Sequence, residues 1–251
     1  MSATQEVAAR LHYAQRVLFI TGAGISADSG LPTYRGVGGL YDDTLTSDGI
    51  PIEVALSGSM LAQHPDITWK HLHQIERHCR GAAPNLAHRA IAEIERRLPF
   101  VLTFTQNIDG LHALAGSQRL VEIHGNLHRL RCTRCRHKEQ VSSFDGLAAT
   151  PHCPECGALV RPDVILFGEA LAEENMALLH DALAEGLDLL FSIGTSSRFP
   201  YISAPVAWAR QHRVPVVEIN PDETVVSSLA DFAIRESASV AMGRIMDNMG
   251  W

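Results

Sequence analysis

Hydrophobic residues in this chain fall into short apolar runs separated by segments of helical periodicity. Four such runs predict buried parallel strands at 17–21, 100–105, 187–193 and 214–219. Apolar residues at helical spacing predict helices at 85–97, 173–185 and 204–212, the first of them capped by Asn85. Because strands alternate with helices, we expect an α/β fold with a Rossmann-like, doubly wound parallel sheet.

Two segments break this alternation. Residues 36–80 begin rich in glycine and continue as a helical, histidine-rich segment, and residues 126–160 hold two pairs of cysteines. We expect both to leave the main sheet and pack together as a smaller domain, with a cleft between the domains. The Rossmann-like domain would then consist of residues 1–35, 81–125 and 161–251.

The composition fits an ordinary globular protein. Of 251 residues, 46% are hydrophobic and 20% are charged, and the net charge of −7 provides no overall basic field that would attract nucleic acid. The polar N-terminal segment lacks the apolar core of a signal peptide, and the longest apolar runs are too short to span a bilayer. We therefore expect a cytoplasmic protein without membrane contact.

Four cysteines form two Cys-x-x-Cys pairs, Cys132 with Cys135 and Cys153 with Cys156. In a chain without an export signal, such pairs predict one tetrahedral zinc site rather than disulfides. Four thiolates leave no position for water or substrate, so this Zn²⁺ would be structural. The fifth cysteine, Cys79, stands alone and is expected to be a partly buried thiol.

A G-x-G-x-x-A turn follows the first predicted strand and predicts a nucleotide site. Gly22 permits the tight turn, Gly24 lets backbone N–H groups approach a phosphate, and Ala27 allows a helix to pack closely on the strand. A dehydrogenase would also carry an acidic residue at the end of a second strand, about 20 positions further on. Asp42 and Asp43 lie at that distance but follow no predicted strand, which argues against hydride transfer.

Further motifs occur in a fixed order along the chain. They are GAGISADSGLPTYR at 22–35, TQNID at 105–109, His124-Gly125 before the cysteine pairs, RPDVILFGE at 161–169 and GTS at 194–196. In this order and spacing the chain resembles the sirtuins, which are NAD-dependent protein-lysine deacylases. The resemblance extends over nearly the whole chain.

This resemblance implies an NAD site made of loops at the ends of strands. Asp109 would hold the nicotinamide carboxamide, Asn107 would position the ribose or a water, and Asn220 would contact the adenosine ribose. The residues expected to bind NAD are Gly22, Ala23, Gly24, Ser26, Thr33, Tyr34, Arg35, Tyr41, Gln106, Asn107, Ile108, Asp109, Gly194, Thr195, Ser196, Asn220, Pro221, Asp222 and Ala238.

His124 would be the general base. In the family's reaction the carbonyl oxygen of the acyl-lysine attacks C1′ of the nicotinamide ribose and nicotinamide leaves. His124 then takes a proton through the ribose hydroxyls, and the acyl group ends on ADP-ribose. Imidazole suits this role because its ordinary pKa of about 6.5 leaves it mostly neutral near pH 7. His124, Asn107 and Asp109 are thus the expected catalytic residues.

The segment at 164–169 would be a strand that binds the backbone of an acyl-lysine protein or peptide. Val164 and Phe167 would line an apolar tunnel around the acyl-lysine, and Gly168 and Glu169 would complete the substrate site. One departure from the family pattern lies at 197–201, where the proline is shifted to Pro200. We expect this change to alter contacts to the adenosine or to the substrate.

The acyl preference is predicted from the helix before Pro84. Sirtuins that prefer succinyl or malonyl groups carry a Tyr-x-x-Arg pair there, and counting back from Pro84 places Lys70 and His73 at those positions. Without a guanidinium to hold a distal carboxylate, the sequence predicts acetyl or another uncharged acyl group. The histidines of this segment, His64, His71, His73 and His78, are expected on solvated helix faces.

Two other functions stay open at this point. Mono-ADP-ribosyl transfer shares the step in which nicotinamide leaves, and a zinc-ribbon nucleic-acid-binding module on an α/β scaffold is the second alternative. The net charge of −7 and the set of His124, Asn107 and Asp109 argue against direct binding of nucleic acid. We expect a monomer.

Overall fold

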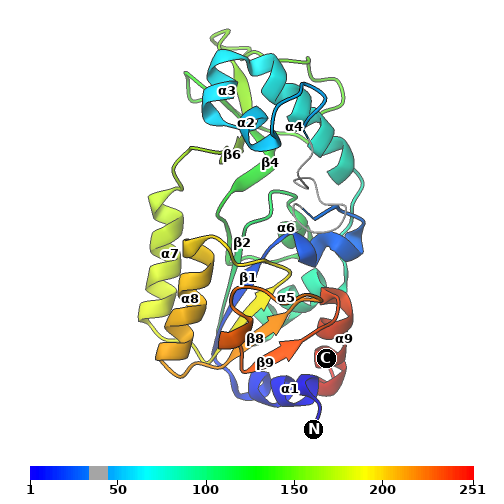
Figure 1. Cartoon of the computed structure of the whole chain (residues 1–251), viewed down its shortest axis with the longest axis vertical. Helices are drawn as coiled ribbons and strands as arrows, with labels where there is room; N and C mark the ends of the chain where they lie inside the picture. Colours follow the sequence, from blue (N-terminus) through cyan, green and yellow to red (C-terminus); the bar gives the residue numbers. More distant parts are fainter. Residues whose placement is uncertain (34–44) are drawn as a thin grey trace.

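Two β-sheets organise the chain, one in each of two packed parts (Figure 1). The computed structural model describes residues 1–33 and 45–251. Tyr34, Arg35 and Tyr41, which the sequence assigns to NAD binding, lie outside the described residues.

The larger sheet has six parallel strands in the order β3-β2-β1-β7-β8-β9. These strands are β1 (Arg16–Thr21), β2 (Phe100–Thr105), β3 (Leu120–Glu122), β7 (Leu189–Ile193), β8 (Val216–Ile219) and β9 (Phe232–Ile234). All four predicted strands are present, and the parallel order confirms the Rossmann-like α/β prediction. The sequence did not predict β3 and β9, because three residues are too few to show a periodicity.

Helices cover both faces of this sheet (Figure 1). One face packs against α1 (Ala3–Tyr13), α5 (Leu86–Arg97) and α9 (Ala238–Met249), and the other against α7 (Glu173–Ala184) and α8 (Pro200–Gln211). In β1, Val17 and Phe19 enter the first core whereas Leu18 and Ile20 enter the second. Burial on both faces explains why these strands are continuous apolar runs.

Asn85 caps α5 as predicted, since its side chain accepts the N–H of Ala87 at 2.9 Å.

The smaller part combines an antiparallel sheet in the order β5-β4-β6 with helices from earlier in the chain. Its elements are β4 (Gly125–Cys132), β5 (Lys138–Gln140), β6 (Val160–Val164), α2 (Ile52–Ala55), α3 (Gly58–Gln63) and α4 (Pro65–Cys79). Trp69 of α4 is fully buried, and its indole N–H donates to the Val160 carbonyl at 3.0 Å. α4 and the ribbon share one core, and β6 continues the ribbon's sheet beyond residue 160; the exact domain boundaries stay a prediction.

The prediction for one histidine of α4 was wrong. His71 is only 3% exposed, and its Nε2 lies 2.9 Å from a carboxylate oxygen of Asp48, so it is a buried, paired side chain and not a solvated one. A hydrogen-bond partner from a loop more than 20 positions away cannot be read from helical periodicity.

No helix within residues 1–33 and 45–251 has the length and apolar character needed to cross a membrane.

Candidate active site

Three glycines bring the loops after β1 and β7 into contact at the carboxyl edge of the sheet. A Cβ on Gly22 would lie 2.8 Å from the Thr195 Cβ, and a Cβ on Gly24 would lie 2.7 Å from the Gly194 Cα. The Gly24 N–H donates to the Gly194 carbonyl at 2.8 Å, so this N–H serves the contact between the loops. Since β1 lies between β2 and β7, the two loops meet at the switch point where open sheets bind nucleotides.

The turn after β1 continues as a 3₁₀ helix, Ala23–Ser29, where the sequence predicted an ordinary helix. Serine, aspartate and glycine are weak α-helix formers, which favours the shorter, tighter form. Gly30 ends it in the left-handed conformation. The first residue of the 3₁₀ helix, Ala23, lines a pocket beside this turn.

Substitution of Gly194 by alanine tests the contact between the loops. Gly194 has φ +58°, and a Cβ there would lie 2.3 Å from the Ile25 backbone nitrogen. We expect Gly194→Ala to lower the free energy of unfolding by more than the roughly 1–3 kcal/mol of backbone strain alone. Gly186→Ala is the matched control, because Gly186 has φ +86° but a Cβ there would meet no described atom within 4 Å. Equal losses for both variants in urea unfolding would contradict the close-contact explanation.

A buried polar network joins this turn to the loop after β2. The Ser26 hydroxyl donates to Asp109 at 2.7 Å and accepts from the Asn107 amide at 3.1 Å, and the Leu111 N–H donates to the other Asp109 oxygen at 2.9 Å. Burial raises the pKa of the Asp109 carboxyl. The Asn107 Oδ1 is buried without a hydrogen-bond partner in the described part of the chain. An acceptor of this kind fits a ligand that brings a hydroxyl or amide donor.

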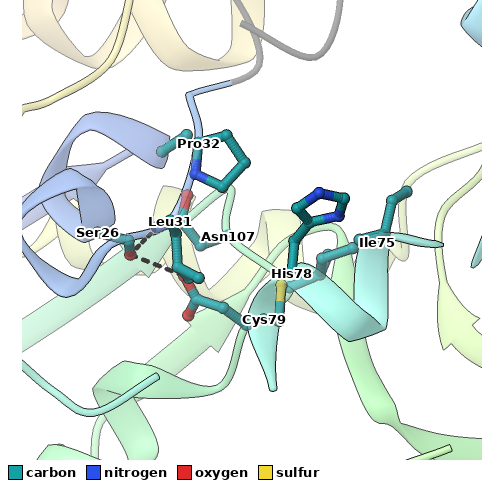
Figure 2. A pocket seen from close by; sticks show the side chains of 10 residues that line it. Ser26, Leu31, Pro32, Ile75, His78, Cys79 and Asn107 are labelled. Atoms are coloured by element: carbon teal, nitrogen blue, oxygen red, sulfur yellow. Dashed lines mark hydrogen bonds between the residues drawn. The ribbon is translucent and has the colours of Figure 1, made fainter. Parts of the chain in front are cut away.

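A small pocket opens between this network and α4 (Figure 2). Leu31 and Pro32 lie on the side of the glycine turn, and Ile75, His78 and Cys79 lie on the side of α4. The remaining lining residues are Ala23, Ser26, Asn107, Ile108 and Asp109. Thr33, which the sequence assigns to NAD binding, directly follows Pro32 of this pocket.

Sequence reasoning did not assign the three pocket residues of α4 to the site. Lys70 pairs with Asp48, and the His73 ring packs against Trp69 and Phe144, so both lie away from the pocket. Ile75, His78 and Cys79 have the spacing i, i+3, i+4 and therefore share one helix face. Cys79 is half-buried as predicted, and burial raises the pKa of its thiol to about 12, which keeps it neutral.

His124 lies directly before β4 and is held on both ring nitrogens. Its Nδ1 is 2.8 Å from the Gln106 carbonyl, which only accepts, so Nδ1 carries the proton in the neutral ring. Its Nε2 is 2.8 Å from the hydroxyl of Tyr201. Burial lowers the pKa of His124, which favours the neutral form near pH 7. The Gln106 side chain in turn donates to the Thr195 hydroxyl at 2.8 Å and so connects the ends of β2 and β7.

The loops after β7 and β8 are also joined. The Asn220 amide donates to the Thr195 carbonyl at 3.2 Å, and its Oδ1 accepts the Asp222 N–H at 3.2 Å. Thr195 is buried, whereas Ser196, Pro221 and Asp222 are exposed at the rim. Ala238 differs from these residues, because its side chain is buried in the core at the start of α9 and leaves only backbone for a ligand.

The segment at 164–169 is a strand end followed by a turn, not the continuous strand that was predicted. β6 ends at Val164, which is buried in the small-domain core, and Gly168 turns the chain at φ +81°. Phe167 forms a parallel bridge with Ser57. The Glu169 carboxylate pairs with the buried Arg161 at 2.9 Å and accepts the Leu166 N–H at 2.8 Å, so it holds the shape of this segment.

The four predicted zinc ligands converge. All four sulfurs lie within 4.8 Å of one another, with 3.5 Å between Cys132 and Cys156 and 3.6 Å between Cys135 and Cys153. Tetrahedral zinc with Zn–S bonds of about 2.3 Å places neighbouring sulfurs about 3.8 Å apart, which these separations match. The cluster is therefore positioned to bind one structural Zn²⁺.

Comparisons with known proteins agree with this geometry. The model of the Sir2 family matches residues 22–199. The NAD-dependent protein deacylase 2 of Pseudomonas syringae pv. tomato is 44% identical over 247 residues, which cover 97% of this chain and 99% of the relative. A solved Sir2 homolog–NAD complex has a TM-score of 0.87 at 31% identity and covers 98% of this chain and 93% of its own.

A second solved structure contains a peptide and an acetyl ADP ribose. It is a Sir2 variant with a deacetylated p53 peptide and 3′-O-acetyl ADP ribose, with a TM-score of 0.88 at 26% identity, and the match covers 100% of this chain and 99% of that one. The family match spans well over half of the chain, and the Pseudomonas relative spans nearly all of it. The chain therefore belongs to the Sir2 family, the sirtuins.

Proposed function

We propose that this chain is an NAD-dependent protein-lysine deacylase that transfers the acyl group to ADP-ribose and releases nicotinamide. The observation that carries the proposal is the orientation of His124 by the carbonyl of Gln106, the residue directly before Asn107 of the buried Asn107–Ser26–Asp109 network. Two comparisons support the proposal. The Pseudomonas relative is named as a deacylase, and the structural neighbours of this chain were solved with NAD and with acetyl ADP ribose.

The strand-end loops fit NAD. The unpaired Oδ1 of Asn107 would accept a hydrogen bond from the nicotinamide ribose or a water, and Asp109 would meet the carboxamide. The joined loops at Gly22 and Gly194 would take the phosphates, with Asn220 beside the adenosine ribose. When bound, NAD supplies nicotinamide as the leaving group and the ribose as the acyl acceptor.

His124 is prepared to take a proton at Nε2. The Gln106 carbonyl holds the proton on Nδ1, so Nε2 carries the lone pair. The lowered pKa of His124 keeps Nε2 unprotonated near neutral pH and able to accept a proton. Leu31, Pro32 and Ile75 give the neighbouring pocket apolar walls that exclude water from the reacting atoms.

The substrate would be an acyl-lysine protein or peptide bound between the two domains. The segment at 165–169, fixed by the pair of Arg161 and Glu169, would bind the peptide backbone. Phe167 would line the acyl-lysine tunnel, and buried Val164 would support it from the core. The proposal includes a cytoplasmic monomer. It includes no direct contact with nucleic acid, and the net charge of −7 supports this last point.

Product analysis tests the proposal against its alternative. Incubation with NAD and an acetyl-lysine peptide should give free lysine and O-acetyl-ADP-ribose by mass spectrometry. A mass increase of one ADP-ribosyl group on the protein or peptide, with the acetyl group retained, would favour mono-ADP-ribosyl transfer instead.

The proposal includes a preference for uncharged acyl groups. Lys70 and His73 stand where succinyl-preferring sirtuins carry tyrosine and arginine, so neither offers a guanidinium, and Lys70 pairs with Asp48 while His73 packs against Trp69 and Phe144. A succinyl carboxylate would enter without a fixed cationic partner, which costs at least about 1–3 kcal/mol, or roughly tenfold or more in rate. We expect kcat/KM to be at least about tenfold higher on an acetyl-lysine peptide than on the same peptide succinylated. Faster removal of succinyl would contradict this assignment.

A further inference from the structure

The hydroxyl of Tyr201 is hydrogen-bonded to Nε2 of His124, the nitrogen through which the general base would act. Tyr201 Oη lies 2.8 Å from Nε2 of His124. Since Nδ1 donates to the Gln106 carbonyl, Nε2 of the neutral ring has no proton and must accept. The phenol is therefore the donor, and the imidazole is fixed between a carbonyl on one side and a hydroxyl on the other.

The loop between β7 and α8 is built to hold this phenol. Ser197 is buried with φ +54°, and its N–H donates to the Thr195 hydroxyl at 3.1 Å. Phe199 and Tyr201 then stack on each other, with ring centroids 5.4 Å apart and an interplanar angle of 14°. Both rings stand edge-on to the imidazole of His124, at 6.2 and 6.0 Å. A non-glycine residue in the left-handed region is a strained conformation, which here directs the two aromatic rings toward His124.

We propose that Tyr201 is a positioning residue for the deacylation reaction: its hydroxyl holds His124 in one orientation and one tautomer until substrate arrives. The inference rests on the proposed function, in which His124 is the general base. Nε2 has one lone pair, so the ribose hydroxyl that gives its proton to His124 must displace the phenol. The bond between Tyr201 and His124 thus belongs to the free enzyme.

The phenol can bind either form of the base. When Nε2 is protonated, the hydroxyl turns and accepts from it, and this bond to the charged ring is the stronger of the two. Burial raises the pKa of Tyr201 to about 12, so the phenol stays protonated throughout the working range. Burial lowers the pKa of His124, and the hydroxyl of Tyr201, as an acceptor for the charged ring, opposes that shift.

The charged groups near His124 are already engaged elsewhere. Glu122, two residues earlier, pairs with Arg129 at 2.7 Å and accepts from Asn126 at 2.7 Å. Asp109 binds Ser26 and the Leu111 N–H. Among the described residues, Tyr201 is thus the titratable group in direct hydrogen-bond contact with the ring of His124.

The test is Tyr201→Phe, which keeps the stacked ring and removes only the hydroxyl. The acid limb of the kcat/KM profile reports the free enzyme and should move to lower pH, because the charged ring loses its acceptor, with kcat/KM on that limb raised roughly 3- to 10-fold relative to its plateau. The acid limb of kcat reports the substrate complex, where the phenol is displaced, and should stay in place. Tyr13→Phe is the matched control, because Tyr13 is an exposed tyrosine beside a histidine on α1.

An NMR titration of His124 in the free protein provides a readout that needs no activity. The midpoint should fall in Tyr201→Phe and stay unchanged in Tyr13→Phe. An unchanged midpoint, or an equal loss of kcat/KM at every pH, would overturn the inference and leave Tyr201 as a packing residue. Failure of the proposed function is distinguishable, because it would show as full deacylation by His124→Ala while the titration of His124 still responds to Tyr201.

Discussion

Replacement of His124 by alanine is expected to reduce deacylation turnover roughly 10²- to 10⁴-fold, the usual contribution of a positioned general base. The reason is the geometry of the ring, whose Nδ1 is fixed by the Gln106 carbonyl while Nε2 carries the lone pair. The two nearby histidines cannot replace it. His88 and His112 are buried behind the network, where their Nε2 atoms contact Ser26 and Thr21.

Turnover of His124→Ala should be measured beside His180→Ala, which removes an exposed imidazole on α7. The control should keep wild-type turnover, and both variants should keep the melting temperature and the NAD affinity of the wild type. Turnover of His124→Ala within about twofold of wild type would contradict the assignment of His124 as the base.

Loss of one zinc ligand is expected to unfold the small domain and abolish activity, although no cysteine of the cluster takes part in the chemistry. Structural zinc sites of this type contribute about 10–16 kcal/mol in small peptides, as much as the whole stability of a typical domain. Cys132 ends β4 and Cys153 is buried in the core that also contains Trp69 of α4. Because α4 supplies Ile75 to the pocket, disorder of the ribbon should spread to the site.

The corresponding measurement compares Cys132→Ala with Cys79→Ala, which removes the one cysteine outside the cluster. Metal analysis should find one zinc per chain in Cys79→Ala and none in Cys132→Ala. Limited proteolysis should cut Cys132→Ala within residues 126–160. A zinc-free preparation with full activity and a protected ribbon would refute the structural role of the metal.

The sequence predicted the main sheet well because its strands are buried on both faces. Val17 to Ile20 alternate between two cores, so every position is apolar and the run is easily recognised. The segment at 164–169 is also apolar, but Gly168 and the pair of Arg161 with Glu169 turn it away from a strand. The spacing of apolar residues indicates which positions are buried. It does not indicate a side-chain ion pair that bends the backbone.

The site was predictable where it lies in loops directly after strands. The Gly22 turn, Asn107 and Asn220 follow strands that the pattern identified, and parallel strands bring their carboxyl ends to one edge. The parts supplied from outside the sheet were missed. His78 comes from a helix of the small domain and Tyr201 from the first turn of α8, and their positions depend on tertiary packing. Counting back from Pro84 addressed only the acyl preference, which stays a prediction.

The most direct test of the central claim is the stoichiometry of the wild-type reaction with an acetyl-lysine peptide. Nicotinamide, free-lysine peptide and O-acetyl-ADP-ribose should form in equal amounts, and none of the three should form without NAD. Peptide deacetylation that proceeds without NAD, or nicotinamide release that leaves the acetyl group on lysine, would contradict the claim.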